Sequence, residues 1–393
     1  MKKLLIVFFI ACFTALNQAT YKEVLHLYEF QIKSYLNKHN IKAIKKIAAT
    51  KINPELKSGF WPNHWPFAMG IGEKKAFWVT FKNFGLAEVT PLINPAFQNL
   101  TDIAGSKDGE ILIADQTGNL IYIYQLNSTL SKEKILQKIA ITKPKKIKLS
   151  KNKTLAILTD NTVQIYSKKD NSYTLKKTLT ENINKNISAK LILDIAFDNR
   201  NQLYLLTKES VYVFNKYGRL IKNITLEKSI DSFDVTNYRN IIGMSKKDNK
   251  VYLFSDNGLL LESKVFPNFK QKDNYKFIYF APFSYMGIYN NLEGYAYNMG
   301  LDIKEFKWEA STNNKKSFSF TTTFPAKTSI SITDSKNNIL LTLIDNKLLK
   351  ANQHNFTFEL PNNKNKKNYT LTISGKALYS QSNIKKKTIN FTE

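Results

Sequence analysis

Three aspartates could supply ligand-binding carboxylates, because each stands at a similar distance before an apolar run in a different part of the chain: Asp102, Asp194 and Asp231. Asp234 lies close to the last of them. If folding brings these positions to one opening, their oxygens could hold Ca²⁺ or coordinate a polar substrate. The alternative is structural, with each carboxylate accepting hydrogen bonds from backbone N–H groups. A lysine, Lys145 or Lys146, occupies the corresponding position between Asp102 and Asp194, which favours the structural role.

A segment rich in aromatic residues and proline, residues 61–67, is the second candidate site. Its two prolines exclude a helix and favour a rigid, extended loop. Exposed aromatic side chains contribute strongly to protein and carbohydrate binding, so Trp61, His64 and Trp65 are candidate ligand-binding residues. The alternative is that the segment fills the gap between the N-terminal segment and the domain that follows.

The sequence lacks the short motifs that identify many enzymes. It has no Gly-x-Ser-x-Gly, P-loop, HExxH or CxxC motif, and its four histidines do not stand at metal-ligand spacing. We therefore predict no catalytic residue, no metal and no cofactor. A pair of carboxylates distant in the sequence could still cleave a glycan, so an enzyme of that kind remains the alternative.

A repeat organises the middle of the chain. Five segments of β-branched and aromatic residues end at Tyr124, Tyr166, Phe214, Phe254 and Tyr297. Their spacings of 42, 48, 40 and 43 residues are typical of four-stranded propeller blades, and residues 76–89 supply a sixth unit. We predict an all-β fold with a β-propeller over residues 60–309. Six blades are favoured, with seven as the alternative, and the five aromatic residues should occupy equivalent positions on third strands.

Residues 101–124 and 193–214 are the clearest of these units. They resemble NHL-type propeller repeats, whose blades run as an apolar strand, an aspartate, a glycine turn, an apolar strand and an aromatic strand. The resemblance implies a propeller of six blades around a central channel.

The last 79 residues, 315–393, contain further strand-like runs and suit a small β-sandwich. The strand-like runs of this region share a pattern of apolar and polar positions: Ile330, Ile332, Asp334, Leu341, Leu343, His354, Phe356, Phe358, Tyr369 and Ile373. In these residues the region resembles the Ig-like domain of flagellar hook-capping proteins and of many bacterial surface proteins. The resemblance implies an Ig-like β-sandwich used for recognition.

The first residues have the pattern of an export signal. Lys2 and Lys3 precede an apolar run of 13 residues, 4–16, and the small residue Ala19 follows. The run is shorter than the ~20 residues that cross a bilayer as a helix. We predict a signal peptide over residues 1–19 and a periplasmic or cell-surface location. The alternatives are an uncleaved anchor and a lipoprotein that carries its lipid on Cys12, the single cysteine.

Residues 20–59 are expected to form a short helical segment and a linker. Apolar side chains recur at helical spacing from residue 21 to about residue 49, with a break near His39. We predict that this segment packs on the next domain or forms a stalk. Contact with a membrane surface is the alternative.

The charge of the chain also bears on its partners. Lys and Arg number 58 against 31 Asp and Glu, which gives a net charge of +27, yet only three of the cations are arginines. Arginine is the residue favoured for base readout, so we predict no specific nucleic-acid binding. The charge favours acidic partners, and peripheral contact with an anionic membrane is a further option.

The combined pattern predicts an exported cell-envelope binding or scaffold protein. Its propeller and Ig-like surfaces would recognise an envelope or surface protein, which the charge suggests is acidic. The alternative is a propeller-type hydrolase or lyase that acts on a glycan at the central channel. The oligomeric state is left open.

Overall fold

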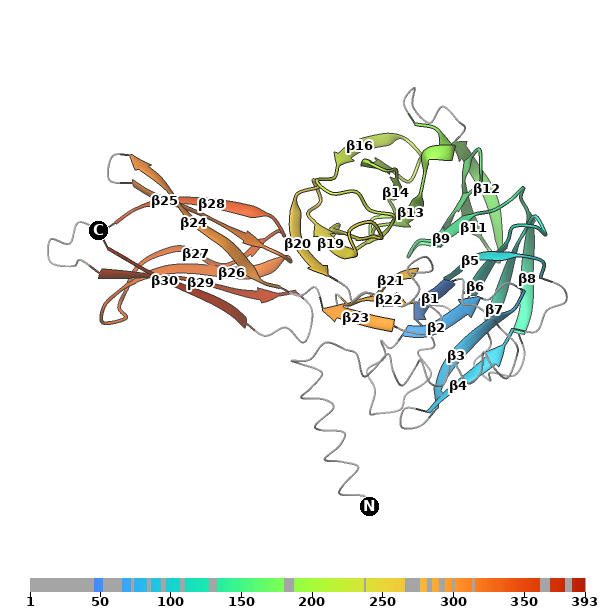
Figure 1. Ribbon diagram of the computed structural model, residues 1–393, viewed down its shortest axis with the longest axis horizontal. Helices are drawn as coiled ribbons and strands as arrows, with labels where there is room; N and C mark the ends of the chain where they lie inside the picture. The colour runs from blue at the N-terminus through green and yellow to red at the C-terminus, as the bar shows by residue number, and fades with distance from the viewer. Residues whose placement is uncertain are drawn as a thin grey trace, which may run out of the picture.

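The computed structural model describes residues 46–51, 66–71, 74–82, 86–92, 97–106, 110–126, 133–179, 187–236, 238–265, 276–280, 285–289, 294–298, 301–312, 315–360, 368–378 and 384–392. Over these residues the regular structure is almost entirely β-strand, with one short 3-10 turn, η1 (Ala189–Leu191) (Figure 1). The predicted all-β class is therefore confirmed. No helix within the described ranges is long and apolar enough to cross a membrane.

Six antiparallel sheets follow one another along the first part of the described chain. The first two sheets consist of β1 (Lys46–Lys51), β2 (Pro66–Ile71), β3 (Ala76–Lys82) and β4 (Leu86–Pro91), then β5 (Leu100–Gly105), β6 (Glu110–Asp115), β7 (Leu120–Leu126) and β8 (Glu133–Ala140). The third and fourth consist of β9 (Lys146–Leu149), β10 (Thr154–Leu158), β11 (Val163–Lys169) and β12 (Ser172–Leu179), then β13 (Asp194–Phe197), β14 (Leu203–Leu206), β15 (Ser210–Phe214) and β16 (Leu220–Thr225). The fifth and sixth consist of β17 (Ser232–Val235), β18 (Ile241–Ser245), β19 (Lys250–Phe254) and β20 (Leu260–Val265), then β21 (Lys276–Phe280), β22 (Tyr285–Tyr289) and β23 (Gly294–Asn298).

The first strands of these sheets form a closed ring. β1 contacts β5, and contacts continue from β5 to β9, from β9 to β13, from β13 to β17 and from β17 to β21. β21 in turn contacts β1, so the sheet nearest the N-terminus lies beside the last one. Figure 1 shows the sheets arranged around this ring. The arrangement is that of a β-propeller, in which radial repetition leaves only short sheet edges.

The predicted aromatic positions are confirmed. Tyr124, Tyr166, Phe214, Phe254 and Tyr297 all lie on the third strands of their sheets. The first four are buried, and in each of their sheets the pairing with the fourth strand shifts register immediately before the aromatic residue. A bulge at this point bends the outer edge of the sheet and increases its twist.

The turns between first and second strands share a hydrogen bond that the repeat search did not detect. Ser106, Ser150, Asp198 and Thr236 each accept a bond from the backbone N–H four residues later, at 2.8–3.2 Å. In the last three turns the residue before that donor has a left-handed backbone, namely Lys153, Asn201 and Arg239. The polar side chain and the left-handed residue close each turn locally.

The N-terminal boundary of the propeller differs from the prediction. Residues 46–49, expected to end the helical segment, belong to strand β1, which pairs with β2 along its whole length. Pairing with β2 and contact with β5 and β21 therefore override the helical spacing of the apolar residues. The propeller begins at Lys46 and not at residue 60. The predicted signal peptide and residues 20–45 lie outside the described residues.

The C-terminal region consists of two sheets packed face to face. One sheet has the order β24 (Ile303–Thr312), β25 (Lys315–Thr322) and β28 (Gln353–Glu359). The other has the order β27 (Ile339–Leu349), β26 (Ala326–Asp334), β29 (Asn368–Ala377) and β30 (Ile384–Thr392). A core that includes Phe318, Phe320, Ile330 and Ile373 joins the two sheets. The prediction placed residues 303–309 in the propeller, but β24 pairs with β25 and so belongs to this sandwich.

The sandwich packs directly on the fifth propeller sheet. One buried cluster combines Ile242, Met244 and Leu253 of that sheet with Phe324 and Ala326 at the base of the sandwich. Phe324 is fully buried. The two domains therefore share a hydrophobic core, which we call the seam, and Figure 1 shows β19 and β20 beside the end of the sandwich.

Candidate functional site

The pairing register identifies which inner-strand residues are equivalent. Asp102, Lys146, Asp194 and Ser232 each pair with the same position of the second strand, namely Ala114, Leu158, Leu206 and Met244. The expected equivalence of Asp102, Lys146 and Asp194 is thus observed. Asp231 does not belong to this set, because Ser232 takes the position. Asp231 is exposed before β17, where its Oδ2 accepts a bond of 2.6 Å from the backbone N–H of Lys246.

The two equivalent aspartates link neighbouring sheets. The buried Asp102 accepts a bond of 2.8 Å at Oδ2 from the backbone N–H of Ile147, on the first strand of the next sheet. The buried Asp194 accepts one of 3.3 Å from Phe233 in the same way, and Lys146 Nζ lies 3.7 Å from its Oδ1. Backbone N–H groups that donate to these carboxylates are the contacts expected for the structural alternative. Ligand binding by Asp102, Asp194 and Asp231 stays a prediction.

An ion pair joins two sheets that are not neighbours in the ring. Lys148 Nζ, on β9, lies 3.1 Å from Asp234 Oδ2, on β17, and the side chains are 23% and 25% exposed. Because the fourth sheet stands between them in the ring, the pair reaches across part of the central channel. Within the described ranges no group of three or more His, Cys, Asp or Glu side chains could hold a metal ion.

A second ionic cluster is buried between the second and third sheets. The side chain of Glu110 is fully buried and contacts Lys168 Nζ on β11. Lys153 Nζ lies 3.7 Å from its Oε2, and the Tyr173 hydroxyl donates to the same oxygen at 3.3 Å. A buried carboxylate needs such partners, because an unpaired charge in the interior is very costly. This cluster fixes the two sheets to each other.

The candidate residues Trp61, His64 and Trp65 lie outside the described residues. Their role in ligand binding stays a prediction.

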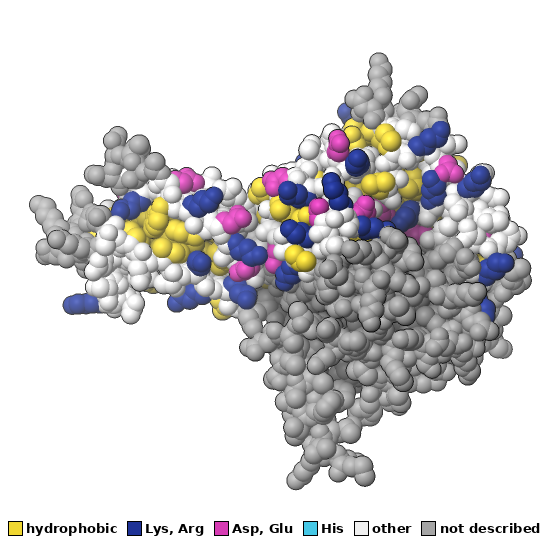
Figure 2. All heavy atoms as spheres, in the orientation of Figure 1, with side chains coloured by type: hydrophobic (Ala, Val, Ile, Leu, Met, Phe, Trp, Pro, Cys, Tyr) yellow, Lys and Arg dark blue, Asp and Glu magenta, His cyan; other side chains and the backbone are white. Residues whose placement is uncertain are grey.

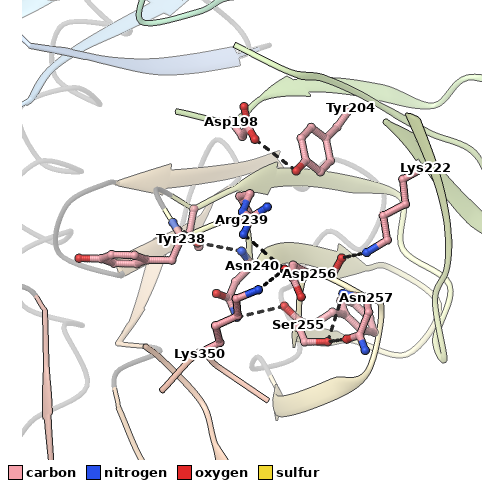
Figure 3. Close-up of polar contacts among 12 residues, drawn as sticks. Asp198, Tyr204, Lys222, Tyr238, Arg239, Asn240, Ser255, Asp256, Asn257 and Lys350 are labelled. Atoms are coloured by element: carbon pink, nitrogen blue, oxygen red, sulfur yellow. Dashed lines mark hydrogen bonds and ion pairs between the residues drawn. The ribbon is translucent and has the colours of Figure 1, made fainter. Parts of the chain in front are cut away.

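A polar network with contributions from both domains lies at the edge of the seam (Figure 3). It consists of Lys222 on β16, Arg239 before β18, Asp256 after β19 and Lys350 after β27, and we call these four residues the junction cluster. Arg239 Nη2 lies 3.7 Å and Lys350 Nζ 3.9 Å from Asp256 Oδ2. Lys222 Nζ donates to the backbone oxygen of Asp256 at 2.7 Å.

Sequence reasoning missed the junction cluster. Its four residues come from separate turns and strands, and no shared spacing connects them. One signal was available, because Arg239 is one of only three arginines in a chain rich in lysine. That residue type is favoured where a planar, multidentate contact with an anion is required.

Near the junction cluster, a half-buried histidine should make the sandwich sensitive to acid. His354 Nε2 lies 2.9 Å from the Lys350 carbonyl oxygen, to which it must donate, and 3.0 Å from Thr322 Oγ1. Burial lowers the pKa of His354, although the hydrogen bond to Lys350 opposes this shift. The unfolded chain therefore binds the proton more readily, and stability is lost as the pH falls below the unfolded value of about 6.5.

We expect urea midpoints of the protein to decrease between pH 7 and pH 5, and this decrease to be smaller in His354→Gln. Other titratable groups contribute equally to both proteins, so the difference between the two decreases in urea midpoint reports the contribution of His354. An equal decrease in both proteins would show that His354 does not cause the acid sensitivity.

No protein-family model matches the chain, and no curated protein sequence matches it. Among solved structures, PorZ of Porphyromonas gingivalis is 11% identical, with a TM-score of 0.50, and the match covers 88% of this chain but only 51% of PorZ. Virginiamycin B lyase of Staphylococcus aureus is 12% identical, with a TM-score of 0.42 over 59% of this chain and 76% of the lyase. The WD40 domain of Neurospora crassa Pan2 is 12% identical, with a TM-score of 0.43 over 60% and 76% of the two chains. At 11% identity and a TM-score of 0.50, the similarity to PorZ concerns the fold alone.

Proposed function

We propose that the protein is an exported cell-envelope binding or scaffold protein that recognises other proteins through its propeller and an Ig-like sandwich. The observation that carries this proposal is the shared core of the two domains, with charged side chains around its edge. Because the two domains pack together at the seam, their outer surfaces meet there and form one continuous surface. Both propellers and sandwiches commonly serve as recognition platforms.

The proposal includes the finer predictions about the chain. We infer that the six sheets are the blades of an NHL-like propeller, that residues 1–19 direct export, and that the protein is periplasmic or at the cell surface. PorZ is described as a surface component of the type-IX secretion system, which is in line with this location. Lipidation of Cys12 is the alternative form of attachment.

The alternative, a hydrolase or lyase acting on a glycan at the channel, has less support. The carboxylates of Asp102 and Asp194 are buried and accept backbone hydrogen bonds from the next sheet, so they are poorly placed to reach a substrate. Glycoside hydrolysis generally needs two carboxylates that flank the scissile bond, one as the acid and the other as the base or the nucleophile.

Crosslinking in intact cells tests the proposed function. The full chain with a C-terminal tag is expected to fractionate with the envelope and to crosslink to one or a few exported proteins. The matched control lacks residues 2–19, and it should lose these crosslinks. Identical crosslinks in both forms, or recovery only from the cytoplasm, would contradict the proposal.

A further inference from the structure

We propose that the junction cluster is the docking point for an acidic polypeptide segment of the partner protein. This inference rests on the proposed function and names the chemistry of the partner. Its basis is the unequal number of charges at the cluster. Arg239 and Lys350 face the single carboxylate of Asp256, and Lys222 donates to the backbone oxygen of the same residue.

Arg239 and Lys350 face the Asp256 carboxylate, but their N–H groups do not form close hydrogen bonds with it. Arg239 and Lys350 approach the same oxygen at 3.7 and 3.9 Å, which is longer than a hydrogen bond. Among the described residues, the side chains of Arg239 and Lys350 make no polar contact other than these ion pairs. A guanidinium carries five N–H donors, arranged to bind a carboxylate through two of them. A second carboxylate could therefore bind beside Asp256 without displacing an existing hydrogen bond of either cation.

The cluster is open to a partner. The Lys350 side chain is 71% exposed, and those of Arg239 and Asp256 are 27% and 28% exposed. Figure 2 shows Lys and Arg side chains gathered where the sandwich meets the propeller, with acidic side chains among them. Tyr238, next to Arg239, packs against the buried seam and so anchors the turn that presents the arginine.

The backbone at Arg239 determines which substitution tests the side chain. This residue has a φ of 68°, in the left-handed region that non-glycine residues rarely adopt. Lys153 and Asn201 hold the equivalent position in the turns of the third and fourth sheets and share this conformation, so the turn itself requires it. Asparagine tolerates the left-handed region, so Arg239→Asn removes the cation and leaves the turn unstrained.

A second charged centre at the seam also joins the two domains, with two acidic and two basic side chains. Glu262 on β20 lies 3.3 Å from Lys304 on β24 and 3.7 Å from Lys264, while Lys304 also lies 3.8 Å from Asp302. Each centre thus combines residues of the propeller and the sandwich, and each alternates acidic and basic groups. Such a mixture is typical of protein–protein surfaces, which use charge for specificity. DNA and anionic membranes bind best to an uninterrupted basic surface, where no carboxylate repels their phosphates.

The test measures binding of a fluorescent peptide of alternating Glu and Ser to the protein after removal of the predicted signal. A peptide with Gln in place of Glu serves as the ligand control. The variant combines Arg239→Asn, which suits the left-handed turn, with Lys350→Gln. The matched protein control, Lys385→Gln with Lys387→Gln, removes two exposed lysines from β30. Circular dichroism and thermal unfolding confirm that each protein is folded.

We expect the junction variant to bind the acidic peptide about tenfold more weakly or worse at about 150 mM salt, and the β30 control to change affinity less than threefold. Equal losses in both variants, or no binding of the peptide to the unaltered protein, would overturn the inference. It would also be overturned if the junction variant lost binding to duplex DNA or phosphatidylglycerol vesicles but kept the peptide. If crosslinking identifies a partner whose capture does not depend on Arg239 and Lys350, this inference fails while the proposed function stands.

Discussion

Replacing Phe324 by alanine is expected to lower the free energy of unfolding by about 3–5 kcal/mol, because the ring is fully buried in the seam between the two domains. The cavity would remove contacts from Ile242, Met244 and Leu253 of the fifth sheet as well as from the sandwich. Urea denaturation followed by tryptophan fluorescence and circular dichroism measures the loss. We expect the two signals to change together, since the domains share this core.

Ile339→Ala is the matched control for Phe324→Ala. Ile339 is an apolar residue of the sandwich that is 67% exposed, so its truncation should change the free energy of unfolding by less than about 0.5 kcal/mol. If Phe324→Ala cost less than about 1 kcal/mol, the shared core would not couple the domains. If it altered one of the two signals alone, the same conclusion would follow.

The repeat could be read from the sequence because each blade buries its residues in the same pattern. Tyr124, Tyr166, Phe214 and Phe254 follow alternating apolar residues on the third strands, and these residues form the cores between neighbouring sheets. A packing requirement that recurs at each sheet leaves a recurring trace in the chain. The equivalence of Asp102 and Asp194 could be predicted because the repeat sets the same spacing in each unit.

Other features could not be predicted, since they depend on contacts between distant residues. The helical spacing near Ile47 was overridden by pairing of β1 with β2 and by its place in the ring. The spacing predicts Asp231 at the position equivalent to Asp102 and Asp194, but the structure places Ser232, the next residue, there. Only the pairing of Ser232 with Met244 defines this one-residue difference in register. The junction cluster joins Lys222 to Lys350 across two domains, so no local pattern indicates it.

Glu110→Gln is expected to destabilise the protein by about 3–5 kcal/mol, because it leaves Lys168 buried without its carboxylate partner. The Lys168 side chain is only 10% exposed, and the Glu110 side chain is completely buried. Lys153 would also lose its ion pair, and the Tyr173 hydroxyl would lose a charged acceptor. Urea denaturation at pH 7 measures the change.

The double variant Glu110→Gln with Lys168→Met separates the cost of an unpaired charge from the value of the pair. Methionine keeps much of the volume of the lysine stem and carries no charge, so burial without a partner no longer penalises the folded state. We expect the double variant to recover at least half of the stability lost by Glu110→Gln. If it is less stable than the single variant, the contribution of Lys168 comes from contacts other than the ion pair. The cluster would then not act as the electrostatic link between the second and third sheets.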